Sequence, residues 1–459
     1  MKTHWLLTLI TIPAAALLIL AAACSRSGEA ARSWSLPQPV SIVSFEGGKE
    51  WATIFPSGSQ WLSGNVGGGT AGLLLRDGDL VWQENLIVYR LSDGPKLKMA
   101  FNGWSAQLAG KVVSLSLESG TEGREWLEKA STQDLAAIRF LTLPADADAA
   151  LLSALKRLAA LNPGVALGVK SNAALQHLLP LFRPRVLLLD NDELNAEGRK
   201  AVVDQQQIET LFVAGEKPGS LAFLPRLRAL HRLLITNWDV GQAGPLPAGL
   251  DGLESIVVAN SKLTDLAALS AAPPGLEELS LVGCKELVDV SGLARFSGLK
   301  TVILEGNEKV SALPSLANLQ QLQWVGLPPK ISQEQFAALI RAHPSLRILE
   351  LVGCENVTDL EPLSGLKVLE GLILSGSYKN LEVVPTLKSL RFVGVPADAF
   401  EKSPEQVRAI QKALPDALVV PVSGLCLGSG WILLLVPMVA ATRLIARRRR
   451  RPSTPSGDA

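Results

Sequence analysis

The 459-residue chain has few of the residues that most often form crosslinks or carry chemistry. It contains four cysteines, too few for a disulfide scaffold in a chain of this length. Its four histidines are scattered: His4, His177, His231 and His343. So few and widely spaced histidines make a metal site or a histidine-based catalytic triad improbable. The formal net charge of +1 gives no electrostatic reason to expect a nucleic-acid partner.

Motifs that would indicate an enzyme are also missing. No G-x-S-x-G nucleophile turn, no Walker-type phosphate loop and no H-E-x-x-H zinc motif occurs in the sequence. The stretch from Gly67 to Gly72 fits G-x-G-x-x-G literally. However, LLLRDGDLVW follows it, which predicts a strand and a turn where a dinucleotide site would need a helix. We therefore expect a protein without catalytic residues, cofactor or bound metal.

What the sequence does contain is a short leucine phrase, L-x-x-L-x-L, repeated many times. Its seven clearest copies begin at Leu230, Leu253, Leu276, Leu299, Leu322, Leu346 and Leu369, so that neighbouring copies start 23 or 24 residues apart. A period in the twenties with this phrase predicts a solenoid, in which each unit buries its leucines only against its neighbours. Because alternate side chains of a strand face opposite ways, phrase positions four and six should fill the interior.

Short segments after the later strands carry a second pattern, L-x-D-L-x-x-L. It reads VTDLEPL from Val357 to Leu363, and related segments begin at Leu263 and Leu287. With these segments the sequence resembles the bacterial leucine-rich-repeat family, with internalin-like repeats, over roughly residues 140–400. The resemblance implies an α/β solenoid with parallel strands on a concave face and short helices or turns on the convex face. It implies an architecture, not a reaction.

Composition divides the chain into six segments. Short alternating runs separated by glycine-containing turns predict a small antiparallel β domain before the repeats. Amphipathic stretches over 331–349 and 403–420 interrupt the later repeats, and the second is predicted to cap the solenoid. The predicted segments are a signal peptide (1–24), a linker (25–36), a β-rich domain (37–120), a leucine-rich-repeat solenoid with its cap (125–421), a transmembrane helix (424–446) and a basic cytoplasmic tail (447–459).

Helical patterns separate the early strands. They predict one helix from Ala150 to Leu161 and another from Asn172 to Phe182. A third is predicted from Glu193 to Asp204, with Asp192 as its N-terminal cap. Early repeats are therefore expected to place helices on the convex side, whereas later repeats use tighter connections.

Cys284 and Cys354 both follow LVG at the turn after a strand, three repeats apart. Strands stack about 4.8 Å apart, which separates the two sulfurs by roughly 14 Å. A disulfide needs α-carbons within about 7 Å, so a bond between these two cysteines in one molecule is excluded. We interpret both as structural thiols at the turn.

The N-terminus reads as a secretory signal. An apolar run from Leu6 to Ala23 follows Lys2 and ends in Ala-Ala-Ala-Cys24. This end resembles a bacterial lipoprotein cleavage site, at which Cys24 would become the lipidated first residue. Cleavage by the ordinary signal peptidase suits the same alanines, and the sequence leaves the two outcomes open.

The C-terminus reads as a membrane anchor. The stretch from Gly424 to Thr442 holds 19 residues without a charge, enough for a helix of about 28 Å. Arginines from Arg447 to Arg451 follow and would keep that end cytoplasmic. The sequence thus predicts a single-pass cell-membrane protein that crosses from Gly424 to Ala446 and has an exported body. Removal of the segment as a sorting signal is the alternative.

Phrase positions three and five are predicted to face the concave side, away from the buried leucines. Near the C-terminal repeats these positions are apolar, which is unusual for a surface that faces water. The candidate partner-binding residues are Ile303, Trp324, Ile348, Ile373 and Phe392. Either they bind another protein, or the N-terminal β domain or a neighbouring loop covers them.

The expected function is non-catalytic: the solenoid presents its concave surface to an unknown protein partner in the bacterial envelope. The alternative is an envelope structural or adhesion module that binds sugar through its β domain. Tryptophans can stack on sugars, although in a small β domain they more often form the core. Six of the ten tryptophans fall in or beside this domain: Trp34, Trp51, Trp61, Trp82, Trp104 and Trp126.

Overall fold

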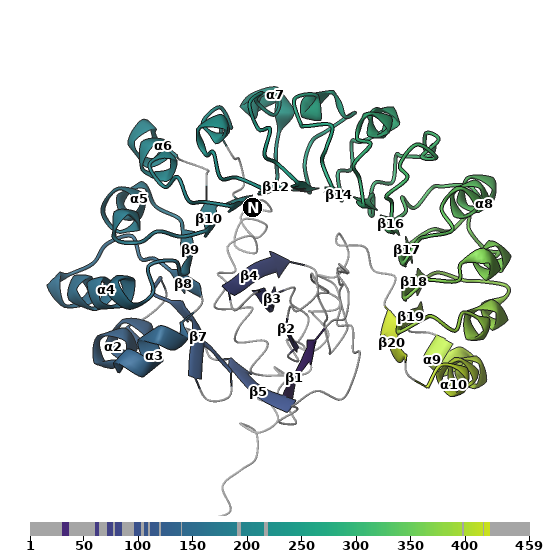
Figure 1. The fold of residues 1–459 in the computed structure, drawn as a ribbon, viewed down its shortest axis with the longest axis horizontal. Coiled ribbons are helices and arrows are strands. Elements are labelled where there is room, and N and C mark those ends of the chain that lie inside the picture. Colours follow the sequence, from purple (N-terminus) through teal and green to yellow (C-terminus); the bar gives the residue numbers. More distant parts are fainter. Residues whose placement is uncertain are drawn as a thin grey trace, which may run out of the picture.

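The computed structural model describes residues 111–422 except 119–120, 139, 191–193, 215–218, 397–398 and 416. Before residue 111 it describes six strands: β1 (Ala30–Ser35), β2 (Gln60–Ser63), β3 (Ala71–Arg76), β4 (Asp79–Glu84), β5 (Lys96–Phe101) and β6 (Ser105–Leu108). Figure 1 shows the repeats as an arc, with strands along its inner side and helices along its outer side.

A long parallel sheet forms the inner side of the arc. Each of its strands from β7 onward pairs in parallel with the next one along the chain. These strands are β7 (Lys111–Ser116), β8 (Phe140–Thr142), β9 (Ala166–Val169), β10 (Val186–Asp190), β11 (Thr210–Ala214), β12 (Arg232–Thr236), β13 (Ser255–Ala259), β14 (Glu278–Val282), β15 (Thr301–Ile303), β16 (Trp324–Gly326), β17 (Ile348–Val352), β18 (Gly371–Ser375), β19 (Phe392–Pro396) and β20 (Leu418–Val422).

The strands keep one register across the repeats. Glu278 of β14 stands beside Thr301 of β15, which stands beside Trp324 of β16 and then Ile348 of β17. All four occupy phrase position three. The fixed period of the sequence therefore brings equivalent positions into straight rows across the sheet, as the repeat predicts.

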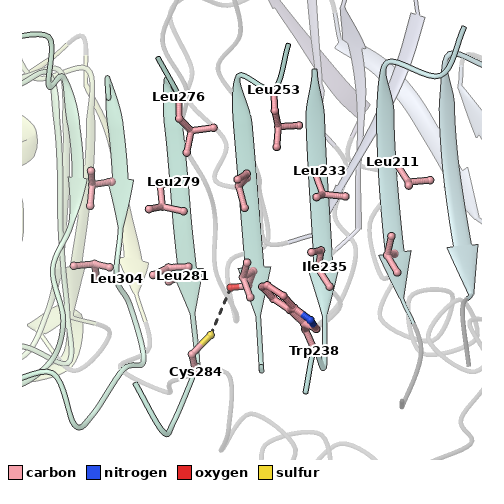
Figure 2. Packing of buried hydrophobic residues seen from close by; sticks show 14 of the residues in the cluster. Leu211, Leu233, Ile235, Trp238, Leu253, Leu276, Leu279, Leu281, Cys284 and Leu304 are labelled. Atoms are coloured by element: carbon pink, nitrogen blue, oxygen red, sulfur yellow. Dashed lines mark hydrogen bonds between the residues drawn. The ribbon is translucent and has the colours of Figure 1, made fainter. Parts of the chain in front are cut away.

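The interior of the solenoid is built from the leucines of the phrase. Leu279, Leu281, Leu304, Leu327 and Leu351 are all 0–1% exposed. Figure 2 shows Leu233 and Ile235 of β12 and Leu279 and Leu281 of β14 at matching levels, with β13 between the two strands. Full burial of one such side chain contributes about 2 kcal/mol from transfer out of water. The stack of parallel strands with buried leucines fits the solenoid part of the predicted architecture.

The outer side of the arc carries helices in the early repeats and 3-10 turns in many later ones. The α-helices are α2 (Glu122–Lys129), α3 (Thr132–Ala137), α4 (Ala149–Leu161), α5 (Asn172–His177), α6 (Ala196–Val203), α7 (Val240–Ala243), α8 (Gln333–Ala342), α9 (Ala399–Lys402) and α10 (Pro404–Ala413). The 3-10 turns are η1 (Leu179–Leu181), η2 (Leu224–Arg226), η3 (Ala267–Leu269), η4 (Ser291–Arg295), η5 (Glu361–Gly365) and η6 (Leu381–Thr386).

Two of the three predicted early helices differ from the prediction in detail. The segment predicted from Asn172 to Phe182 is split into α5 and η1, with Pro180 in the second piece. The third helix begins later than predicted: α6 starts at Ala196, and the Asn195 side chain caps it by accepting a hydrogen bond from the Gly198 N–H at 2.7 Å. Asp192, the predicted cap, lies outside the described residues.

Buried polar contacts close the turns after the strands. Asn307 is 0% exposed; its side chain accepts from the Cys284 N–H (2.8 Å) and donates to the carbonyls of Leu281 (2.7 Å) and Leu304 (2.9 Å). The Cys284 thiol lies 3.8 Å from the Val258 carbonyl, the contact dashed in Figure 2, and burial raises its pKa to about 11. Cys284 and Cys354 are both buried and free, and their structural role at the turn stays a prediction.

The six strands before β7 pair antiparallel. β6 pairs with β7 and with β5, β5 pairs with β1, and β1, β2, β3 and β4 then pair in sequence. The sheet is therefore hydrogen-bonded from these strands into the solenoid, because β7 also pairs with β8. The segment boundaries given above stay predictions.

The predicted single-pass membrane localisation is contradicted. Among the helices that the structure describes, none is long and apolar enough to cross a membrane. The longest, α4, has 13 residues, or about 20 Å at 1.5 Å per residue, well short of the roughly 30 Å hydrocarbon layer. The segments on which the prediction rested, 1–24 with Cys24 and 424–446, lie outside the described residues.

Candidate recognition surface

The structure brings four of the five candidate partner-binding residues together on the concave face, over strands β15 to β18. Trp324 and Ile348 are neighbours in the row of position three. Ile303 and Ile373 lie in the row of position five, with Gly326 and Glu350 between them. We call this group the concave patch: Ile303, Trp324, Ile348, Ile373 and Glu350. Phe392 follows in β19, and its side chain lies outside the description.

The apolar members of the concave patch are buried. Their exposed fractions are 2% for Ile303 and Trp324, 1% for Ile348 and 0% for Ile373. Positions on the same face of earlier strands, such as Leu234 in β12 and Val257 in β13, are only half-buried. The sequence left two interpretations open: these residues bind another protein, or another part of the chain covers them. Their burial favours the second interpretation. Partner binding at these residues stays a prediction.

Gly326 makes room for close packing within the patch. A Cβ atom at this position would lie 3.0 Å from Cγ2 and 3.2 Å from Cδ1 of Ile303. The Ile303 side chain therefore occupies the space above the glycine. Any larger residue at Gly326 would push against Ile303, so the patch depends on a small residue in the middle of its row.

A buried carboxyl group lies within this apolar setting. Glu350 is 2% exposed, and Trp324 donates its Nε1–H to Glu350 Oε1 at 2.6 Å. Burial raises the pKa of Glu350 well above its ordinary value, and the neighbouring charge of Glu305 raises this pKa further. The Trp324 hydrogen bond opposes the shift in this pKa.

Glu305 completes the pair, two residues beyond Ile303. Its Oε1 atom is buried and has no hydrogen-bond partner, and burial raises the pKa of this carboxyl as well. Protonation of one of these two carboxyl groups would remove a buried charge, and the raised pKa values of Glu305 and Glu350 favour it. The candidate residues predicted from the sequence did not include Glu350. An acidic residue at such a position was the available signal.

The N-terminal part of the concave face is more polar. Arg232 of β12 donates to Glu278 of β14 at 3.0 Å, across the intervening strand. Ser255 of β13 donates its hydroxyl hydrogen to the same Glu278 oxygen at 2.6 Å. We call these three residues the polar row. The Arg232 side chain is 26% exposed, and that of Glu278 is 13% exposed, so the row borders water.

Ion pairs also follow the edge of the sheet at phrase position two. Arg185 contacts Glu209 at 2.7 Å, Lys300 contacts Glu277 at 2.6 Å, and Arg347 contacts Glu370 at 2.6 Å. Each pair joins one repeat to the next. At partly exposed positions such pairs contribute at most about 1 kcal/mol each, so they assist the register that the leucines set.

Within the described part of the chain, no group of three or more His, Cys, Asp or Glu side chains is placed to hold a metal ion. His343 is buried, with a pKa lowered by desolvation, and its Nε2 has no hydrogen-bond partner.

Of the six tryptophans that suggested sugar binding, Trp126 packs against the solenoid core from α2. The side chains of the other five lie outside the description.

The chain has in-register parallel strands on the inner side of the arc, helices on the outer side and a leucine core, and this arrangement resembles a leucine-rich-repeat solenoid. This class rests on the strand ladder of the chain itself. It is a class of protein that presents an extended curved surface.

Comparison with known proteins gives partial likenesses. No protein-family profile matches the chain. It is 29% identical over 128 residues to the "Putative adenylate cyclase regulatory protein" of Trypanosoma equiperdum, a match that covers 25% of this chain and 19% of that protein. The chain thus spans about a fifth of the length of this curated relative.

Among solved structures, the chain is similar to two internalins of Listeria monocytogenes. One (inlF) is 17% identical with a TM-score of 0.41, and the match covers 65% of this chain and 93% of that one. The other, internalin C2, is 17% identical with a TM-score of 0.31 and covers 49% of this chain and 84% of that one.

Proposed function

We propose that this protein is a non-catalytic recognition protein that binds a protein partner along its concave sheet. The observation that supports the proposal is the in-register ladder, which aligns a polar row over β12 to β14 with an apolar patch over β15 to β18. Protein interfaces commonly combine an apolar centre with a polar, water-accessible rim. In this proposal the polar row makes the first contact, because it borders water in the structure.

The apolar anchor of the interface is the concave patch, with Phe392 in the adjoining strand. Large apolar and aromatic side chains supply most of the binding energy at protein interfaces. Trp324 is the strongest candidate of this kind, and its neighbours Ile348 and Ile303 would extend the contact. A partner reaches these residues only after whatever buries them has moved aside.

Charge reversal at the polar row tests the proposal. The full chain is used to identify a stoichiometric partner, and the affinity for it is then measured with Arg232→Glu combined with Glu278→Lys. These substitutions preserve an ion pair within the chain but invert the charges that a partner meets. We expect at least a ten-fold loss of affinity, because rim charges govern the electrostatic fit between partners.

A matched control exchanges an ion pair outside the sheet. Arg408 and Glu405 form a 2.8 Å pair on α10 with exposed side chains. Arg408→Glu with Glu405→Arg should leave the affinity unchanged. Equal affinity of the wild type, the polar-row variant and the control would show that the concave face is not the binding surface.

A further inference from the structure

The burial of the concave patch requires a second layer on the sheet. The helices of the repeats lie on the outer side of the arc, so they cannot cover side chains that face inward (Figure 1). Leu234 and Val257 face inward in the same way and remain half-buried, whereas Ile348 and Ile373 are 0–1% exposed. One face of a single sheet does not reach this burial over four neighbouring strands unless other chain packs on it.

The N-terminal strands are in a position to supply that layer. Their ladder runs from β7 through β6 and β5 to β1, and then through β2 and β3 to β4. The antiparallel strands therefore continue the sheet beyond β7, which is the first strand of the solenoid. Figure 1 draws β2, β3 and β4 inside the arc, on the side toward which the concave patch faces.

We propose that the strands β1 to β4 pack on the concave patch as an internal occupant of the recognition surface. The inference builds on the proposed function, since it states that the chain itself holds the site in which a partner would bind. Binding of the partner then requires displacement of these strands, and the affinity is reduced by the fraction of molecules in which the strands are docked.

The apolar composition of the concave patch explains why it would be covered. Isoleucines and a tryptophan on neighbouring strands would otherwise form an apolar surface that promotes association with other chains. Covering this patch keeps it dry until a partner with a better fit competes for it. The buried carboxyl group of Glu350 and the buried Oε1 atom of Glu305 lie in the same place, which also indicates that water is excluded from this surface.

Thiol labelling of the full chain tests the docking. Ile348→Cys places a reporter in the patch, and Val288→Cys places a control at an outer position that is 55% exposed. Both are made with Cys24→Ser and Cys426→Ser, because the remaining Cys284 and Cys354 are buried. We expect a maleimide reagent to react at least ten-fold more slowly with the Ile348→Cys thiol than with the control.

Breaking the N-terminal sheet identifies the occupant. Leu74 lies in β3 and pairs with Trp61 of β2 and Val81 of β4, so Leu74→Pro removes a ladder N–H at the centre of this sheet. A second proline, Leu62→Pro, does the same in β2, where Leu62 pairs with Ser33 of β1. With both prolines, labelling of Ile348→Cys should accelerate at least ten-fold, while that of Val288→Cys stays unchanged and circular dichroism shows that the repeats are still folded.

Two results would overturn the inference. One is equal labelling of Ile348→Cys and Val288→Cys in the chain without prolines. The other is continued protection of Ile348→Cys when both prolines are present. Neither measurement involves a partner. A failed affinity test beside a protected Ile348→Cys would remove the proposed function alone, and the opposite pair of results would remove only the internal cover.

Discussion

At the scale of single residues, the structure buries polar groups where neighbouring repeats can satisfy them. Asn307 shows this most clearly, because its side-chain amide forms hydrogen bonds with three backbone groups in two neighbouring repeats. A buried group that found no partner would cost about 1–3 kcal/mol. Glu350 differs from Asn307. Its side chain accepts one hydrogen bond from Trp324, and its raised pKa favours the protonated, uncharged carboxyl group.

The raised pKa of Glu350 predicts that the effect of Glu350→Gln on stability depends on pH. The raised pKa of Glu350 means that the folded state binds the proton more tightly than the unfolded state does. The resulting stabilisation is fully present below the ordinary pKa of 4.5 and is lost as pH rises through the raised value. The amide carries no charge, and its oxygen still accepts from Trp324. Glu350→Gln should therefore raise Tm at pH 8 and leave it nearly unchanged at pH 4.

The expected gain at pH 8 is a few degrees, because about 1 kcal/mol shifts Tm by roughly 2–4 °C in domains of 150–250 residues. Thermal unfolding followed by circular dichroism at both pH values measures it. Glu355→Gln is the control, since the Glu355 side chain is 76% exposed and should show little change at either pH. A variant that is less stable than wild type at pH 8 would contradict a buried, protonation-linked pair.

At the scale of elements, capping decides where the convex helices begin. Ser332 accepts from the Gln335 N–H at 3.2 Å, and the Gln335 side chain accepts from the Ser332 N–H at 3.2 Å. This reciprocal pair fixes the start of α8, which buries Phe336, Leu339 and Ile340 against the core. α10 starts differently: its N-cap residue Ser403 makes no side-chain cap bond, and Pro404 opens the helix.

The two serines therefore predict unequal effects. Ser332→Ala should lower the free energy of unfolding by about 1 kcal/mol, the usual effect of losing an N-cap bond. Ser403→Ala is the matched control and should change it by less than about 0.5 kcal/mol, as is usual for substitutions away from such features. Chemical denaturation of the full chain measures both. Similar losses for the two variants would show that the cap bond of α8 contributes nothing.

At the scale of the whole molecule, stability is distributed along the solenoid. Each repeat packs on the two beside it, so the stability is close to a sum of repeat and interface contributions. The leucines at phrase positions four and six are 0–1% exposed from Leu211 in β11 to Leu374 in β18. Damage in one repeat should therefore spread to its neighbours and weaken with distance.

Leu281→Asp tests this picture. It places a carboxylate at a fully buried position of β14, and burial of an unpaired charge is strongly destabilising. We expect hydrogen exchange to show lost protection in β13, β14 and β15, with β8 and β9 retaining theirs. Val288→Asp, at a 55% exposed position close in sequence, is the control. Unchanged protection in β14 would contradict the register of the leucine phrase.

Much of the fold could be predicted from the sequence because each repeat contacts mainly its neighbours along the chain. The period sets the register, and alternation along a strand sends Leu279 and Leu281 inward. The rows of Trp324 with Ile348 and of Ile303 with Ile373 follow from the same arithmetic. Local rules were less decisive for helix starts: several polar residues near α6 could serve as a cap, and the backbone of the folded loop selects Asn195.

The leucine spacing alone thus determined the solenoid, its inward core and the positions that face the concavity. Tertiary structure alone decided whether those positions meet water. Ile348 and Leu234 are equally apolar and sit on the same face, yet only Ile348 is fully buried. Burial of a sheet face depends on a layer that comes from elsewhere in the chain, and no periodicity within the repeats encodes where that layer packs.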